Sequence, residues 1–182
     1  DGSSRAGSDQ RPAATGASEI YTSILLAVVA GIVHAGLAPV IEVAGVRPNL
    51  ILVAVVLVTA LLGFGQGILW AFIGGLTANL LVLDPLGTLP LSLLLVSAMV
   101  AGGARVLGRL IWVYPVLAAF AGSVAADLVK LGVYRLVDDP LQIGFPLDVI
   151  IPAAFLNAAI LALLLYPARM STARLVPEEP AW

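Results

Sequence analysis

The chain of 182 residues contains no cysteine and a single histidine, His34. The absence of cysteine excludes disulfides, thiol catalysis and cysteine-based metal sites. One histidine cannot build a histidine-rich metal centre. A glycine-rich phosphate loop, a Ser–His–Asp set and a His-Glu-x-x-His motif are also missing from the sequence. We therefore expect a protein that carries no cofactor and is not an enzyme.

Charged residues are scarce as well. They make up 11% of the chain, against 60% hydrophobic residues, and they form no basic cluster. Nucleic acid is therefore not an expected partner. A soluble domain of this length cannot bury so many apolar residues, because roughly 30% of the surface stays exposed even in a compact fold. The composition predicts an integral membrane protein whose helices contact lipid.

The apolar residues fall into six runs, and a transmembrane helix needs about 20 such residues. Turn-forming glycine and proline separate the runs, as in Gly45–Pro48, Gly63–Gly67 and Asp84–Pro90. The expected fold is an all-α membrane protein, a bundle of six transmembrane helices. The six expected spans are residues 20–43, 49–63, 67–83, 89–106, 112–134 and 148–167.

Two short polar segments flank this membrane domain, which we place at residues 19–168. Residues 1–18 are rich in Gly, Ser and Ala and predict a disordered N-terminal tail. Residues 169–182 are expected to form a cytoplasmic C-terminal tail. The first apolar run is too long for a signal peptide, so we expect it to be retained as a helix.

The distribution of Lys and Arg predicts the orientation. With six spans, both termini and the second and fourth loops lie on one side. That side carries six of the nine basic residues, Arg5, Arg11, Arg105, Arg109, Arg169 and Arg174. The other side collects most acids, Glu42, Asp84, Asp138, Asp139 and Asp148. This asymmetry favours cytoplasmic N- and C-termini.

Polar side chains within the apolar runs are the candidates for function, because they are costly in lipid. For His34 we favour a hydrogen bond at a helix–helix contact, with ligand or proton chemistry as the alternative. For Asn79 we again favour a packing role. Asn157 lies in the last run and is a further polar candidate. Asp127 and Lys130 are three residues apart on one helix face. We expect them to form a structural ion pair. The alternative is that Asp127 is an acid involved in transport and that Lys130 extends toward water.

Small residues recur at four-residue steps in two of the runs. Gly67, Ala71 and Gly75 lead to Asn79, with Gly74 beside them. A similar row begins at Ala27 and Gly31 in the first run. Such rows let another helix approach closely.

The order of several motifs resembles the family of the rod shape-determining membrane protein MreD. The resemblance covers about residues 45–168 and rests on Val46-Arg47-Pro48-Asn49-Leu50, on Gly67, on Gly74-Gly75-Leu76-Thr77-Ala78-Asn79-Leu80-Leu81, on Asp84-Pro85-Leu86-Gly87, and on Pro152, Asn157 and Leu165-Tyr166-Pro167. Family members often carry Asp where this chain has Asn49 and Asn79. A role that requires a carboxylate there does not transfer, whereas a hydrogen-bonding role does.

The resemblance implies a non-enzymatic scaffold in the bacterial inner membrane that belongs to the cell-elongation complex for peptidoglycan synthesis. Such proteins bind MreC and link MreB filaments indirectly to RodA and its class B transpeptidase. The implied fold is similar to the substrate-binding subunits of energy-coupling-factor transporters. The candidate residues for helix packing or partner binding are His34, Asn49, Gly67, Ala71, Gly74, Gly75, Asn79, Asp84, Asp127, Lys130 and Asn157.

On the scaffold hypothesis, the membrane helix of MreC docks on one of the small-residue faces. Leucine at Gly74 and Gly75 should then disrupt either the bundle or that docking. The alternative function is a vitamin-binding subunit of an energy-coupling-factor type transporter. It requires a polar pocket near the outer surface, for which the available lining is His34, Asn49, Asn79, Asp127 and Asn157. An intramembrane enzyme is the least favoured hypothesis, since no nucleophile–base pair can be assembled.

Overall fold

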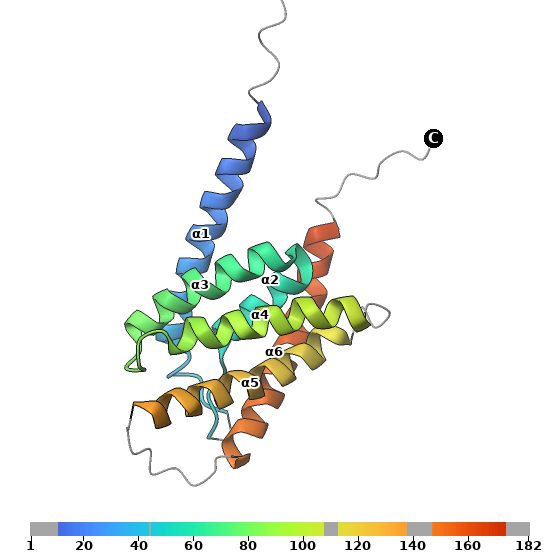
Figure 1. The fold of residues 1–182 in the computed structure, drawn as a ribbon. Coiled ribbons are helices and arrows are strands. Elements are labelled where there is room, and N and C mark those ends of the chain that lie inside the picture. The colour runs from blue at the N-terminus through green and yellow to red at the C-terminus, as the bar shows by residue number, and fades with distance from the viewer. Residues whose placement is uncertain (1–10, 44, 108–112, 138–146, 174–182) are drawn as a thin grey trace, which may run out of the picture.

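The computed structural model describes residues 11–43, 45–107, 113–137 and 147–173, and its regular elements are all helices (Figure 1). The expected all-α fold is confirmed for this part of the chain. The helices are α1 (Arg11–Leu37), α2 (Leu50–Leu62), α3 (Phe64–Leu81), α4 (Thr88–Leu107), α5 (Tyr114–Leu136) and α6 (Leu147–Ala173).

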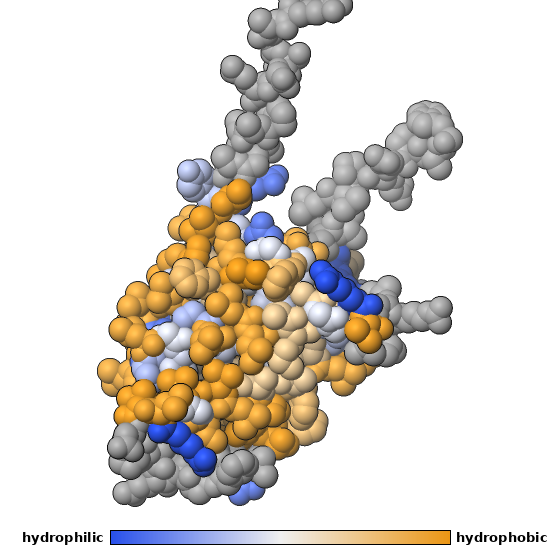
Figure 2. Space-filling view, in the orientation of Figure 1, coloured by the Kyte–Doolittle hydropathy of each residue, from blue (hydrophilic) through white to orange (hydrophobic). Residues whose placement is uncertain are grey.

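Five of these helices, α1 and α3 to α6, are long and apolar enough to cross a bilayer. The chain is therefore a multi-pass membrane protein. Figure 2 shows apolar side chains over most of the visible face, as expected for a surface that meets lipid. Helix α2 differs, because it has only 13 residues. At 1.5 Å per residue it extends about 20 Å, which is less than the hydrocarbon core of a bilayer. The expectation of six full-length spans is met in length by five helices of the described chain, and α2 is the exception.

The short helix α2 lies at the centre of the bundle. It contacts each of the other five helices in the described part of the chain. Its residues Ile51, Leu52, Val53, Val55 and Val56 are almost fully buried and form the middle of the apolar core. A helix surrounded by protein does not need to reach the lipid headgroups, because neighbouring helices can satisfy its backbone ends. This position explains why a short helix is stable here.

Helix boundaries differ from the expectation at both ends of the domain. Helix α1 begins at Arg11, so residues 11–18 are helical rather than disordered. It ends at Leu37, shortly before Pro39, because proline excludes the preceding residue from helical geometry. Helix α6 continues to Ala173 and includes the first residues of the expected C-terminal tail. The outer parts of both tails, and most of the acidic loop before α6, lie outside the described residues.

Small residues allow helices of this chain to pack closely against one another. A methyl group added to Gly31 of α1 would lie 2.6 Å from the carbonyl oxygen of Gly74 on α3. One added to Gly75 would lie 2.9 Å from the Cα of Pro90 on α4. Both sides of α3 are therefore in close backbone contact with its neighbours.

This packing corrects one expectation about partner binding. The row formed by Gly67, Ala71, Gly74 and Gly75 is buried within the bundle. Leucine at Gly74 or Gly75 would consequently disrupt the bundle itself. A partner helix cannot reach this row unless it displaces α1 or α4.

We predict that Gly31→Ala destabilises the bundle by about 1–3 kcal/mol, because the added methyl group forces α1 away from α3. Gly36→Ala is the matched control, since Gly36 lies on the same helix with open space around it. Thermal unfolding in detergent compares the two variants with the wild type. Equal midpoints for the two variants would show that the Gly31–Gly74 contact is not tight.

Candidate functional site

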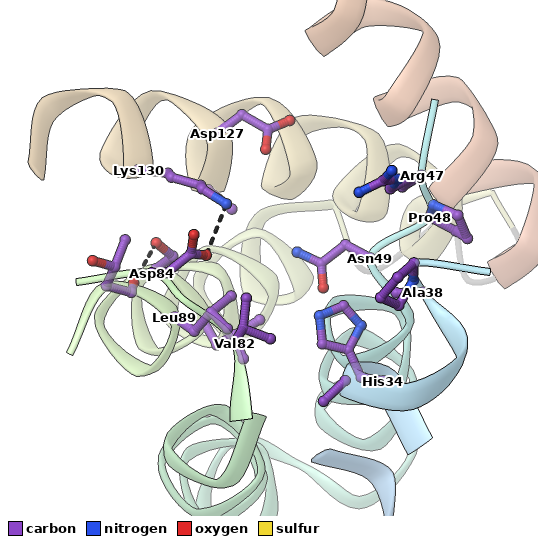
Figure 3. Close-up of a pocket in the computed structure, with 16 residues that line it drawn as sticks. His34, Ala38, Arg47, Pro48, Asn49, Val82, Asp84, Leu89, Asp127 and Lys130 are labelled. Carbon is purple, nitrogen blue, oxygen red and sulfur yellow. Dashed lines mark hydrogen bonds and ion pairs between the residues drawn. The ribbon is translucent and has the colours of Figure 1, made fainter. Parts of the chain in front are cut away.

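A cavity of about 240 Å³ lies at the end of the bundle where α1, the loop before α2, the turn between α3 and α4, and α5 meet. The side chains around it come from segments far apart in the sequence (Figure 3). Its polar and charged lining residues are His34, Arg47, Asn49, Asp84, Thr88, Ser92, Asp127 and Lys130.

One side of this cavity is the start of α2. The side-chain oxygen of Asn49 accepts a hydrogen bond of 3.1 Å from the backbone N–H of Leu52 and so caps the helix. The backbone N–H of Asn49 donates to Oδ1 of Asn157 at 2.8 Å, and Nδ2 of Asn157 donates to Oγ of Ser123 at 2.8 Å. Asn157 is 1% exposed. These bonds connect α2, α5 and α6, and they show that Asn157 has an interhelical role.

Asp84 forms the opposite side, in the turn between α3 and α4. Its carboxylate accepts hydrogen bonds from Nζ of Lys130 at 2.8 Å and from the Tyr134 hydroxyl at 2.5 Å. The Asp84 side chain is only 10% exposed. The expected ion pair between Asp127 and Lys130 is therefore wrong. Residues three apart share a helix face, but Lys130 reaches away from its own helix to the buried carboxylate of the neighbouring turn.

Asn79 stabilises the same turn through hydrogen bonds between its side chain and the backbone of the turn. Its side-chain oxygen accepts hydrogen bonds from the N–H groups of Gly87 at 2.8 Å and Leu89 at 3.4 Å, and its Nδ2 donates to the carbonyl of Asp84 at 3.3 Å. Asn79 is 1% exposed and does not line the cavity. It acts on the site indirectly, because it fixes the turn that presents Asp84.

Three polar groups at the cavity have no hydrogen-bond partner among the described residues. His34 is 9% exposed, and its Nδ1 is unpaired. The carboxyl group of Asp127 makes no hydrogen bond or ion pair, and the side-chain nitrogen of Asn49 makes no hydrogen bond. Figure 3 shows all three side chains around one space. Buried polar atoms normally have partners, so the unpaired Nδ1 of His34 indicates a site that can receive a polar ligand. Asn49 and Asp127 are only partly buried, and their free polar groups lie beside it.

Comparison of the chain with family models, curated proteins and solved structures gave no match. Within the described residues, no three His, Cys, Asp or Glu side chains lie close enough together to hold a metal ion. What the cavity offers is hydrogen bonding and charge.

The structure brings together five of the residues selected from the sequence, His34, Asn49, Asp84, Asp127 and Lys130. The remaining residues, Asn79, Asn157 and the small residues of α3, have packing or turn-forming roles. Sequence reasoning missed Tyr134 and Ser123 as partners of Asp84 and Asn157. The four-residue step from Lys130 to Tyr134 would have placed both on one helix face. Nothing in the sequence shows that Asp84 faces them.

We predict that Asn157→Leu destabilises the protein by about 1–3 kcal/mol, because the buried N–H of Asn49 and the hydroxyl of Ser123 lose their partner. Leu163→Ala on the same helix is the control, since Leu163 is exposed. Unfolding in detergent measures both variants. A loss for Asn157→Leu no larger than for Leu163→Ala would contradict the proposed role.

A second prediction concerns the buried carboxylate of Asp84. Lys130→Met should destabilise the protein, because the carboxylate of Asp84 loses its cationic partner. We expect a loss of about 1–3 kcal/mol, which lies between the typical values for exposed and for buried ion pairs. Adding Asp84→Asn should restore part of the loss. A double-mutant cycle by unfolding in detergent measures the coupling. Strictly additive effects would show that the two side chains do not interact.

Proposed function

We propose that this protein is a scaffold of the MreD type, a non-enzymatic subunit of the bacterial cell-elongation complex. In this role it binds MreC in the inner membrane, with both termini in the cytoplasm. Through MreC it connects RodA and its class B transpeptidase to MreB filaments. The fold proposed with this role is that of the substrate-binding subunits of energy-coupling-factor transporters.

The observation that carries this proposal is the convergence of the motifs behind the MreD resemblance. Asn49 of the first motif bonds to Asn157 of the last, across 108 residues. Asn79 of the second motif holds the turn that contains the Asp84–Gly87 motif. The motifs thus build one structural framework, and they use their polar groups in helix contacts. Such a framework favours a scaffold over a catalyst.

A second candidate function, a vitamin-binding subunit of a transporter, draws on the cavity beside His34. Two of the five side chains expected to line a vitamin pocket, Asn79 and Asn157, do not line this cavity and are bonded within the fold. The polar groups left for a ligand are consequently few. We therefore place this function second.

The proposed docking surface for MreC is the outer face of α1. Within the described residues, α1 contacts only α2 and α3, and it stands at the edge of the bundle (Figure 1). Leu25 and Ile32 lie seven residues apart on one exposed side of this helix. A neighbouring membrane helix can pack along such a side through van der Waals contacts.

The test of the function is co-expression with MreC, RodA and the transpeptidase of the same genome. The complex is purified in detergent through a tag on this chain. We expect stoichiometric recovery of MreC through size exclusion. Recovery of the chain alone, or together with an ATPase-linked coupling protein, would overturn the scaffold proposal.

The absence of cysteine permits a precise test of the docking surface. Single cysteines at Leu25 or Ile32 should form disulfides with a cysteine in the membrane helix of MreC. A cysteine at Leu163, which is exposed on α6, is the control. Oxidation in membranes, followed by non-reducing electrophoresis, measures the yield. Equal yields at Leu163 and at the two α1 positions would place the contact elsewhere.

A further inference from the structure

A second cavity of about 430 Å³ adjoins the one beside His34. It lies between the loop before α2 and helices α5 and α6. Both cavities are lined by Arg47, Asp127 and Lys130, so these three residues stand where the two meet. We name the first the polar chamber and the second the apolar chamber.

The polar chamber contains one acid, Asp127, whose carboxyl group makes no direct hydrogen bond or ion pair within the described residues. Lys130 bonds to Asp84 at 2.8 Å, and Arg47 lies 3.7 Å from Glu42. Within the described residues the carboxyl group of Asp127 forms no ion pair, although Lys130 lies close enough to interact with it electrostatically while bonded to Asp84. An ammonium group is its natural complement, because hydrogen bonds to charged groups are stronger than neutral ones.

The same chamber also offers donors for an anionic group. The side-chain nitrogen of Asn49 makes no hydrogen bond among the described residues, and the guanidinium of Arg47 is largely exposed. His34 adds an unpaired Nδ1, which donates or accepts a hydrogen bond according to the tautomer of the imidazole, in a side chain that is more than nine-tenths buried. The polar chamber therefore presents a carboxyl group on one side and hydrogen-bond donors on another. This arrangement is complementary to a zwitterionic headgroup.

The apolar chamber continues from this point between α5 and α6. Its apolar lining is Val46 of the loop, Leu131 of α5, and Val149, Ile150 and Ala153 of α6. Glu42 and Tyr134 add polar groups to the charged residues that it shares with the polar chamber. Val149 is also exposed on the outside of the bundle, where lipid surrounds the protein. A free polar metabolite would leave this chamber unfilled, whereas a hydrocarbon chain would fill it and bury apolar surface.

We infer that the two chambers bind one phospholipid whose headgroup carries an ammonium group. The ammonium lies at the carboxyl group of Asp127, and the phosphate lies near Arg47 and the amide of Asn49. One acyl chain occupies the space between α5 and α6. This binding goes beyond the scaffold role and does not depend on it, because the site lies within this chain alone.

The experiment measures lipid binding by the full chain, purified in detergent without any partner. Native mass spectrometry compares phosphatidylethanolamine, phosphatidylglycerol, which lacks the ammonium, and phosphatidylcholine, whose ammonium cannot donate a hydrogen bond. We expect one molecule of phosphatidylethanolamine to bind on the order of tenfold more tightly than either of the others. Because no partner is present, failure of this test is distinguishable from failure of the scaffold proposal.

Two variants and one control locate the site. Asp127→Asn should lose the preference for phosphatidylethanolamine. Leu131→Trp should weaken binding of all three lipids, because the indole fills the apolar chamber. Asp148→Asn is the control, since Asp148 is an exposed acid on α6 that lines neither chamber. Size exclusion of each variant establishes that it folds, and Leu131→Trp tests the site even if Asp127→Asn does not fold.

Two results would overturn the inference. The first is equal affinity for the three lipids in the wild type, or an unchanged preference in folded Asp127→Asn. The second is displacement of the bound lipid by free O-phosphoethanolamine at equal concentration, which would show that the head alone is recognised. A water-soluble molecule would then be the ligand of the polar chamber.

Discussion

The fold depends on the hydrogen bonds made by the backbone N–H groups at the start of the short helix α2. Helix α2 begins beside the cavity at the partly buried Asn49, and a backbone group left unpaired within a membrane protein costs several kcal/mol. As the N-cap residue, Asn49 accepts a hydrogen bond from the backbone N–H of Leu52, and Asn157 of α6 accepts one from the backbone N–H of Asn49. The arrangement of α2, α5 and α6 follows from these bonds, since Asn157 must also reach Ser123.

The cavity is a consequence of the same arrangement. Because α2 is short, the chain before it must descend into the bundle as a loop, and this loop forms one wall of the polar chamber. The turn after α3 forms another wall, fixed by Asn79 and anchored through Asp84 to α5. The bonded polar groups make the framework rigid. Two polar groups without hydrogen bonds, on His34 of α1 and Asp127 of α5, line the cavity that these elements enclose.

The sequence was sufficient to predict the membrane class, the helical fold and most helix positions, because long apolar runs have few alternatives in lipid. It also identified five of the residues that line the cavity, but not Tyr134 or Ser123 as hydrogen-bond partners. It could not predict their partners. Spacing along one helix suggested that Lys130 pairs with Asp127, whereas the pairing with Asp84 depends on how the α3–α4 turn lies beside α5. Likewise, the row from Gly67 to Gly75 predicts a close contact without showing that α1 and α4 provide it.

The bond between Asn49 and Asn157 has a consequence for how the protein is made. Helix α2 leaves the ribosome long before α6, and it is too short to cross the bilayer by itself. Its start lacks a final partner until the last helix has been synthesised and inserted. The contacts of α2 with α3 and α4 can therefore form during synthesis, whereas the bond between Asn49 and Asn157 completes the domain last.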